Sequence, residues 1–286
     1  MDLVPRVQFG HAVPGGSVTY REYLLNHFSQ DTNVHVDGMS HGGWGMSINP
    51  SQLVAHPEVS NTIAITVSIP ATVTRWVDTE RVRAVSSGAV PYTTTACLVT
   101  ISGTHEFTDL SSTDWSSDFV QYLYYEGVVS GYSDGSFHPS DKVTRAQLAK
   151  MLVGAMGWDI VTPETATFSD VAADNWAYGF VETAYAHGVI SGYADGTFAP
   201  ESAVTRAQLA KMVVNANGWV MQSPDNGGNF ADMSVDDWFY DYAATMNAVG
   251  VMSGYSDGTF RPYDTTTREQ VAKVITLSVF AAPNNE

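Results

Sequence analysis

One stretch of 13 residues occurs three times in the chain and decides its architecture. It is GVVSGYSDGSFHP at residues 127–139, GVISGYADGTFAP at 188–200 and GVMSGYSDGTFRP at 250–262. A pattern that returns at a fixed period indicates repeated structural units, each of which folds alike and packs on its neighbours. The copies therefore divide the second part of the chain.

Each copy occupies the same place in a longer repeat. The repeats open with Phe107, Phe168 and Phe230, which lie 61 and 62 residues apart. In every repeat a Trp follows this Phe by eight residues, and an Arg follows it by 38. These landmarks are Trp115, Trp176 and Trp238, and Arg145, Arg206 and Arg268.

Within each repeat the sequence predicts two helices joined by the turn-rich stretch. In the first repeat Trp115, Phe119 and Leu123 recur at helical spacing and lie on one face. The second helix begins at residues 144–147, Thr-Arg-Ala-Gln, a capping box in which the Thr and Gln side chains satisfy free amides. A hairpin of about 40 residues cannot bury its own apolar face, so the repeats must pack together. We predict an all-α pseudo-threefold bundle of three helix-loop-helix repeats, with boundaries at 106–162, 163–224 and 225–286.

The first 105 residues follow a different pattern. Short alternating apolar runs, such as 61–69 and 94–101, are separated by turn-forming residues such as Pro14-Gly15-Gly16. Alternation with period two between frequent turns is typical of β-sandwiches. We therefore predict an all-β sandwich at residues 1–105. Over residues 13–102 the order of its segments resembles immunoglobulin-like modules, which implies a spacer.

The composition excludes several classes of function. The net charge is −17, from 13 Lys and Arg against 30 Asp and Glu, whereas nucleic-acid binding requires clustered basic residues. No apolar run is long enough to span a membrane. Cys97 is the only cysteine, which excludes an intrachain disulfide and favours a buried core residue. Residues 1–6 start no signal peptide, so a surface protein of this kind is expected to be the C-terminal piece of a longer chain or to have lost its signal.

The three repeats together resemble the S-layer homology (SLH) module of prokaryotic envelope proteins. The likeness covers residues 107–280, from the Phe-x-Asp opening to the Thr-Arg pair and the helix after it. The family's motif has Glu where this chain has Gln147, Gln208 and Gln270, and Glu269 replaces an Ala in the third repeat. The resemblance implies that the modules pack with their first helices central. It also implies that they hold a secondary cell-wall polysaccharide, often pyruvylated, in grooves between neighbouring modules.

The resemblance and the chemistry of the residues indicate the same candidate glycan-binding site. It comprises the family's Arg, at Arg145, Arg206 and Arg268, and its Trp, at Trp115, Trp176 and Trp238. Each Arg starts a helix, where free amides and the helix dipole favour an anion, and a Trp offers a flat surface to a sugar ring. Two alternatives stay open: the Trp residues as helix-face core, and the Arg residues as salt-bridge partners. The lysines five residues after each Arg lie about 140° around the helix, so we expect them to face elsewhere.

The sequence predicts no catalytic site, no metal site and no cofactor. Residues 131–135 and 254–258 match the Gly-x-Ser-x-Gly pattern of a nucleophile elbow. The second repeat has Ala194 in place of the Ser, and the motif lies between helices, so we interpret it as a turn. The N-terminal histidines, His35 and His41 among them, lack the spacing of metal ligands.

We therefore predict a non-catalytic cell-surface anchor that binds anionic, pyruvylated cell-wall polysaccharide and is located outside the cell, in the wall or the S-layer. Its partners would be this polysaccharide and other S-layer subunits, with no nucleic acid and no membrane span. Two alternatives remain: a structural S-layer protein that assembles by protein–protein contacts, and the C-terminal anchor of a larger surface enzyme.

Overall fold

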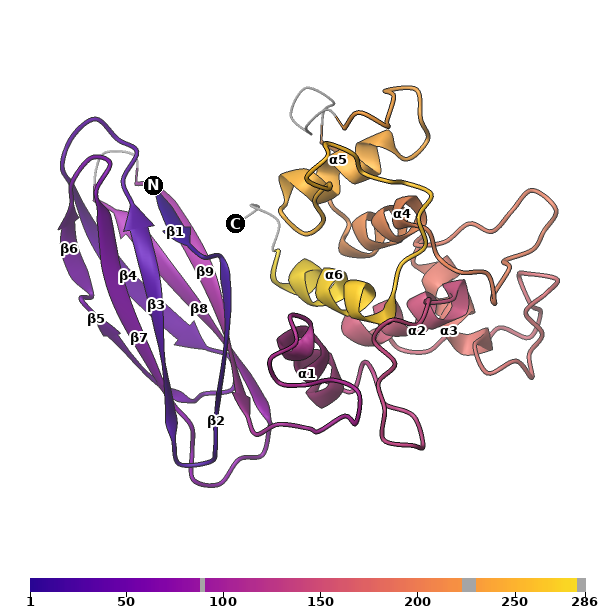
Figure 1. Ribbon diagram of the computed structural model, residues 1–286, viewed down its shortest axis with the longest axis horizontal. Helices are drawn as coiled ribbons and strands as arrows, with labels where there is room; N and C mark the ends of the chain where they lie inside the picture. Colours follow the sequence, from indigo (N-terminus) through magenta and orange to yellow (C-terminus); the bar gives the residue numbers. More distant parts are fainter. Residues whose placement is uncertain (88–90, 223–229, 282–286) are drawn as a thin grey trace. The chain divides into compact units, whose positions relative to one another are not determined.

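The computed structural model describes residues 1–87, 91–222 and 230–281. Its contacts divide the chain into two compact units, Met1–His105 and Glu106–Glu286. The strands belong to the first unit and the helices to the second (Figure 1).

The strands of the first unit form two sheets. One sheet has the order β1-β3-β7-β5 and the other the order β2-β9-β8-β4-β6. The strands are β1 (Asp2–Val4), β2 (Val7–Ala12), β3 (Ser17–Leu25), β4 (Thr32–Ser40), β5 (Gly45–Asn49), β6 (Gln52–Ala55), β7 (Ser60–Ser68), β8 (Val77–Ser86) and β9 (Thr93–Ser102). β2 pairs with β9 in parallel, and the other paired strands are antiparallel.

The two sheets share one apolar core. Ile63 and Ile65 of β7 are fully buried in the same cluster as Val82 of β8 and Leu98 of β9. Along β3 every second residue between Tyr20 and Leu24 is buried and the residues between them are exposed, because successive side chains of a strand point to opposite faces of the sheet.

Each repeat of the second unit contributes two helices. They are α1 (Ser117–Tyr125) and α2 (Arg145–Ala155), α3 (Tyr178–Ala186) and α4 (Arg206–Asn217), and α5 (Tyr240–Ala248) and α6 (Arg268–Phe280). The predicted capping boxes are confirmed at Thr144, Thr205 and Thr267. A left-handed Gly follows the first helix of each repeat, with φ of 73° at Gly127, and this conformation ends the helix.

The three repeats pack in a cycle. The second helices, α2, α4 and α6, contact one another (Figure 1). Each first helix packs on the second helix of the preceding repeat: α3 on α2, α5 on α4, and α1 on α6. Next to the second helices, three backbone hydrogen bonds close a ring: Val143 donates to Thr266, Thr266 to Val204, and Val204 to Val143.

The predicted fold class is wrong. Instead of a sandwich followed by an all-α bundle, the described residues form two β-sheets, one of them curled as a half-barrel, and six short helices that make up 23% of the structure. The helices are short because a glycine stops each first helix, and an ordered turn then occupies the chain up to the next capping box. The expectation that the first helices are central is also wrong, because α2, α4 and α6 make the mutual contacts.

The ordered turn is held by the aspartate of the Phe-x-Asp opening. In the first repeat the Asp109 carboxylate accepts hydrogen bonds from the amides of Phe137 (2.7 Å) and His138 (2.8 Å). Asp170 and Asp232 bind the equivalent amides of the other two repeats. Two charge-assisted hydrogen bonds per repeat explain why these turns hold one conformation without helix or strand.

Candidate functional site: the junctions between repeats

The arginine that starts each second helix lies against the turn of the following repeat. The Arg145 Nε donates to the Phe198 carbonyl at 2.7 Å, the Arg206 Nε to that of Phe260 at 2.7 Å, and the Arg268 Nε to that of Phe137 at 2.9 Å. The first, second and third repeats are thereby linked to the second, third and first. We call these three contacts junction 1–2, junction 2–3 and junction 3–1.

Two aromatic rings of the turn hold each guanidinium. At junction 3–1 the guanidinium carbon of Arg268 lies 4.5 Å from the ring centre of Phe137 and 5.1 Å from that of Tyr132. The corresponding distances at the other two junctions are 4.5–4.7 Å and 4.9–5.0 Å. Cation–π contact therefore adds to the Nε hydrogen bond, and all three junctions share one geometry.

The arginines are more enclosed than the sequence predicts. Their exposed fractions are 7%, 8% and 9%, and burial lowers the pKa of each guanidinium from its ordinary value. Arg206 and Arg268 also donate from Nη2, to the carbonyls of Ser253 (2.9 Å) and Ser130 (3.3 Å). The other Nη nitrogens have no hydrogen-bond partner among the described residues, and none of them is sealed from solvent. Each guanidinium is thus fixed in orientation while at least one nitrogen stays accessible.

The expected free amides at the helix starts are absent. The amide of Arg145 donates to the Ser202 carbonyl and that of Ala146 to the Pro200 carbonyl, while Gln147 donates to the Thr144 hydroxyl. The equivalent amides of α4 and α6 have equivalent acceptors. The turn of the next repeat therefore occupies the site that the sequence assigned to an anion, and only the guanidinium nitrogens remain available.

The three predicted tryptophans lie at the surface. Trp115, Trp176 and Trp238 are 54%, 53% and 53% exposed, which excludes the alternative that they are core residues. Each comes just before a first helix that packs on the second helix of the preceding repeat. Each pair of repeats that an arginine joins therefore also places a tryptophan beside the packed helices of that pair: Arg268 and Trp115, Arg145 and Trp176, and Arg206 and Trp238.

Sequence reasoning missed the direction in which the lysines point. Lys273 Nζ lies 5.8 Å from the ring centre of Trp115, and Lys211 Nζ lies 5.7 Å from that of Trp238. At junction 1–2 Lys150 Nζ lies 5.8 Å from the ring centre of Phe180, which is on the helix that follows Trp176. Each lysine is on the same second helix as the junction's arginine, so both cations face the neighbouring repeat. The fixed interval of five residues was visible, but the packing partner was not.

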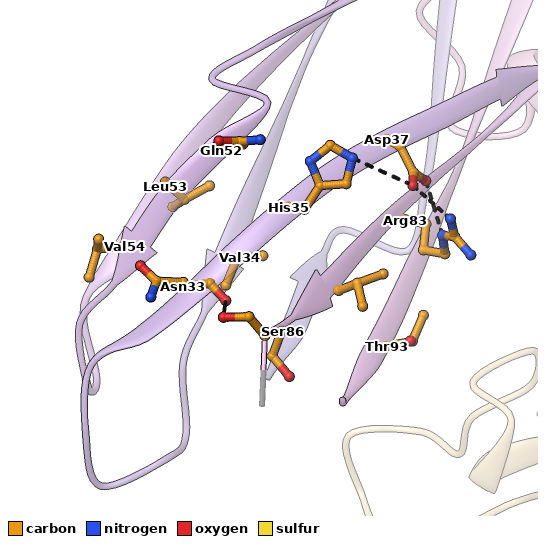
Figure 2. Close-up of a pocket in the computed structure, with 12 residues that line it drawn as sticks. Asn33, Val34, His35, Asp37, Gln52, Leu53, Val54, Arg83, Ser86 and Thr93 are labelled. Carbon is orange, nitrogen blue, oxygen red and sulfur yellow. Dashed lines mark hydrogen bonds and ion pairs between the residues drawn. The ribbon is translucent and has the colours of Figure 1, made fainter. Parts of the chain in front are cut away.

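A cavity of about 730 Å³ lies on the first unit, outside the repeats. It follows β4, β6 and β8 and includes His35, Asp37 and Arg83 (Figure 2). Arg83 binds Asp37 through Nε (3.0 Å) and Nη2 (2.6 Å), which lowers the pKa of that carboxyl. Asp37 is therefore held as an ion-pair partner.

The other motifs are structural in the described part of the chain. The predicted turn at residues 131–135 is confirmed, and the Asp134 carboxylate holds it by accepting hydrogen bonds from the Ser136 amide and hydroxyl. Among residues 1–87, 91–222 and 230–281, no three His, Cys, Asp or Glu side chains gather as metal ligands. No described helix has the length and apolar character that crossing a bilayer requires.

Comparison with known proteins assigns the repeats. The S-layer homology domain family matches residues 106–149, 167–210 and 229–272. The chain carries three tandem SLH domains. Similar proteins include an endoglucanase of Bacillus sp. strain KSM-635, 33% identical over 184 residues, which are 63% of this chain and 19% of that protein. A cellulosome-anchoring protein of Acetivibrio thermocellus is 29% identical over 163 residues, 55% of this chain and 36% of that protein. Cell surface glycoprotein 1 of the same organism is 29% identical over 171 residues, which are 56% of this chain and 7% of that protein.

The SLH domains thus account for a minor part of each relative. The match spans between 7% and 36% of the length of these three proteins. The endoglucanase and the anchoring protein share the repeats although their names describe different activities, so the repeats are a module that occurs in different contexts.

Proposed function

We propose that the second unit is a non-catalytic anchor that holds its chain at the outer cell surface by binding anionic cell-wall polysaccharide at the three junctions. The observation that carries the proposal is the shared geometry of the junctions. Each has an oriented guanidinium with an accessible nitrogen, a lysine and an exposed tryptophan, contributed by two neighbouring repeats. The similarity to a cellulosome-anchoring protein and to a cell surface glycoprotein supports it.

The chemistry of the junctions favours a carboxylated sugar. An Arg nitrogen and a Lys ammonium attract a carboxylate, such as that of a pyruvate ketal, and a Trp face stacks on the apolar side of a pyranose. The chain as a whole carries a net charge of −17, so cations at the same three positions form local exceptions in an acidic protein. Binding at several junctions along one polymer raises retention by avidity even where each contact is weak.

Residues with these roles are Arg145, Arg206 and Arg268 as anion contacts, with Lys150, Lys211 and Lys273 beside them, and Trp115, Trp176 and Trp238 as stacking surfaces. The exposed tryptophans give the cleanest test, because their removal leaves the hydrogen bonds of the junction in place. We expect the triple variant Trp115→Ala, Trp176→Ala, Trp238→Ala to lose most of its co-sedimentation with purified walls that carry pyruvylated polysaccharide.

The matched control is Trp76→Ala, since Trp76 lies in the first unit and is 50% exposed. Its co-sedimentation should equal that of the unaltered chain. Walls from which pyruvate has been removed should bind the unaltered chain as poorly as intact walls bind the triple variant. If the triple variant sediments normally, the junctions are not the binding site. Self-association in size-exclusion chromatography without glycan would instead favour lattice assembly by protein–protein contacts.

A further inference from the structure

One position beside the tyrosine ring that contacts each junction's arginine carries a different residue at each of the three junctions. The residue after the buried Phe of each turn is His138 in the first repeat, Ala199 in the second and Arg261 in the third. Their φ angles are 57°, 56° and 57°, and each amide donates to the aspartate that opens its repeat. The backbone is therefore the same at all three places, and the side chain is the variable.

This variable side chain contacts the tyrosine that also lies against the junction's arginine. At junction 2–3 the guanidinium carbon of Arg261 is 4.0 Å from the ring centre of Tyr255, and that of Arg206 is 4.9 Å from the same centre. At junction 3–1 the His138 ring lies 4.4 Å from the Tyr132 ring, which also contacts Arg268 at 5.1 Å. At junction 1–2 the methyl group of Ala199 supplies no such cation.

The same position decides whether the aspartate carboxylate four residues before it has a cationic partner. Arg261 forms an ion pair of 2.8 Å with Asp257, so junction 2–3 holds a permanent pair. At junction 1–2 Asp195 accepts hydrogen bonds from Thr197 and has no ion pair among the described residues. An uncompensated carboxylate beside the tyrosine repels an anionic ligand, whereas a paired one does not.

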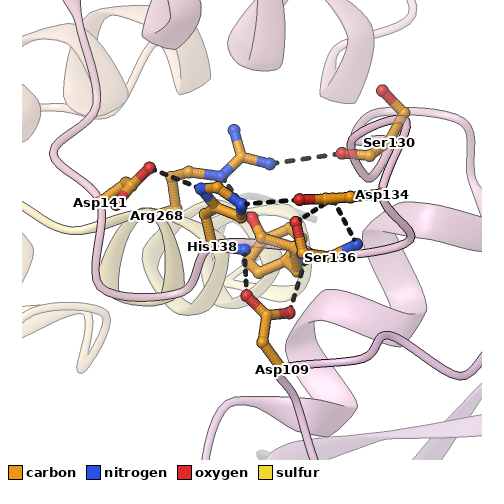
Figure 3. A network of polar contacts seen from close by, with 8 residues as sticks. Asp109, Ser130, Asp134, Ser136, His138, Asp141 and Arg268 are labelled. Atoms are coloured by element: carbon orange, nitrogen blue, oxygen red, sulfur yellow. Dashed lines mark hydrogen bonds and ion pairs between the residues drawn. The ribbon is translucent and has the colours of Figure 1, made fainter.

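Junction 3–1 lies between these two cases because histidine changes its charge. The His138 Nδ1 is 2.9 Å from Asp141 and its Nε2 is 3.7 Å from Asp134, so each ring nitrogen faces a carboxylate (Figure 3). A neutral imidazole donates from one nitrogen only, and the imidazolium donates from both. The hydrogen bond to Asp141 is the main cause that raises the pKa of His138 above its ordinary value.

Three further charged groups lie around His138. The Asp109 carboxylate binds the His138 amide, and Arg268 of α6 lies beside it (Figure 3). Glu269 of α6 donates its amide to the Pro139 carbonyl and directs its carboxylate to the Ser116 hydroxyl, and burial raises the pKa of this carboxyl. Asp109 is already bound to two amides, and Arg268 keeps its charge at all pH values considered. Among the groups that contact the Tyr132 ring, Asp134 and Asp141, His138 is therefore the one whose charge changes near neutral pH.

We infer that His138 makes junction 3–1 a proton-dependent site for an anionic sugar, while junction 2–3 binds the same ligand independently of pH and junction 1–2 is the weakest of the three. This inference rests on the proposed function. When His138 is neutral, Asp134 and Asp141 oppose the ligand's carboxylate; when it is protonated, it compensates both.

The test uses the full chain and one defined probe, a methyl hexopyranoside carrying a 4,6-pyruvate ketal. Binding is followed by NMR at the rings of Tyr132, Tyr193 and Tyr255, which report the three junctions separately. Between about pH 8 and about pH 5 we expect the affinity at junction 3–1 to rise about two- to fivefold, the range expected for one exposed charge pair. The affinity at the other two junctions should stay constant.

Three variants make the test specific. His138→Ala should abolish the pH dependence at junction 3–1, and His138→Arg should fix the affinity at its low-pH value. Ala199→His combined with Ser202→Asp reproduces the His138 environment at junction 1–2 and should create pH dependence there. If the probe binds and junction 3–1 responds to pH no differently in His138→Ala, the inference is wrong while the proposed function stands. If the probe binds at no junction at either pH, both are refuted.

Discussion

Two buried carboxyl groups should make the stability of the first unit depend on pH. Glu80 of β8 is 1% exposed, and burial, followed by the nearby charge of Asp78, raises its pKa to about 8. Glu22 of β3 is 0% exposed, and burial raises its pKa to about 7; its Oε2 has no hydrogen-bond partner among the described residues. Both groups are therefore more easily ionised in the unfolded chain than in the folded one.

The sign follows from proton binding. Between pH 4.5, the ordinary value, and about 8, the folded state holds a proton on Glu80 that the unfolded state has released. Stability therefore falls as pH rises through this window and is constant above it. At about 1.4 kcal/mol per pH unit, the window corresponds to about 5 kcal/mol for Glu80 and about 3 kcal/mol for Glu22. Either is a large part of the free energy of unfolding of a small domain.

The perturbation is Glu80→Gln, which keeps the shape of the side chain and removes its titration. Hydrogen exchange of peptides from β8 and β9 in the full chain, corrected for the intrinsic rate, reports the stability of this unit alone. We expect the unaltered chain to lose protection between pH 5 and pH 8 and the variant to lose about 4 kcal/mol less, which corresponds to three pH units at about 1.4 kcal/mol each. The control is Glu58→Gln, whose side chain is 76% exposed and whose exchange profile should match the unaltered one. Equal losses of protection in Glu80→Gln and the unaltered chain would refute the reasoning.

Two further predictions concern the second unit. Arg206→Ala removes hydrogen bonds to two carbonyls and two ring contacts. We therefore expect urea titration to show a loss of unfolding free energy on the order of 3 kcal/mol, with Arg261→Ala as the exposed control. An unchanged midpoint would show that this side chain does not hold the junction. Asp170→Asn weakens two charge-assisted hydrogen bonds to the turn, so the melting temperature should fall by several degrees. Asp174→Asn should leave the melting temperature unchanged. Equal melting temperatures of Asp170→Asn and the unaltered chain would contradict the role of Asp170.

Features set by neighbours in the sequence could be predicted, and features set by the next repeat could not. The capping boxes at Thr144, Thr205 and Thr267 involve residues three apart, so the motif specifies both partners. The left-handed glycines after the first helices are equally local. In contrast, the acceptors of the Arg145 side chain and of the first two amides of α2 are backbone carbonyls between residues 198 and 202. A carbonyl carries no sequence signal, so a buried, bonded arginine looks the same in the sequence as a free one.

The wrong fold class has a related cause. The pattern of apolar residues identified helices in each repeat, but it gave no measure of how much chain the ordered turns occupy. The turns depend on Asp109 and its equivalents, which bind amides 28 and 29 residues away. A Phe-x-Asp motif suggests a helix start or a turn by itself; its role as a long-range clamp follows only from the packed structure.

The proposed binding uses the same side chains that join the repeats at the junctions. The Nε of each arginine joins two repeats, and the nitrogens left over are those available to a ligand. No single repeat contains a whole candidate site, because the arginine and lysine come from one repeat and the tryptophan, tyrosine and variable residue come from the next. The cycle of contacts from α6 back to α1 is therefore what gives three repeats three junctions instead of two. Junction 3–1, which exists only through this closure, is also the junction that carries His138, so the proposed proton-dependent site depends on the complete set of repeats.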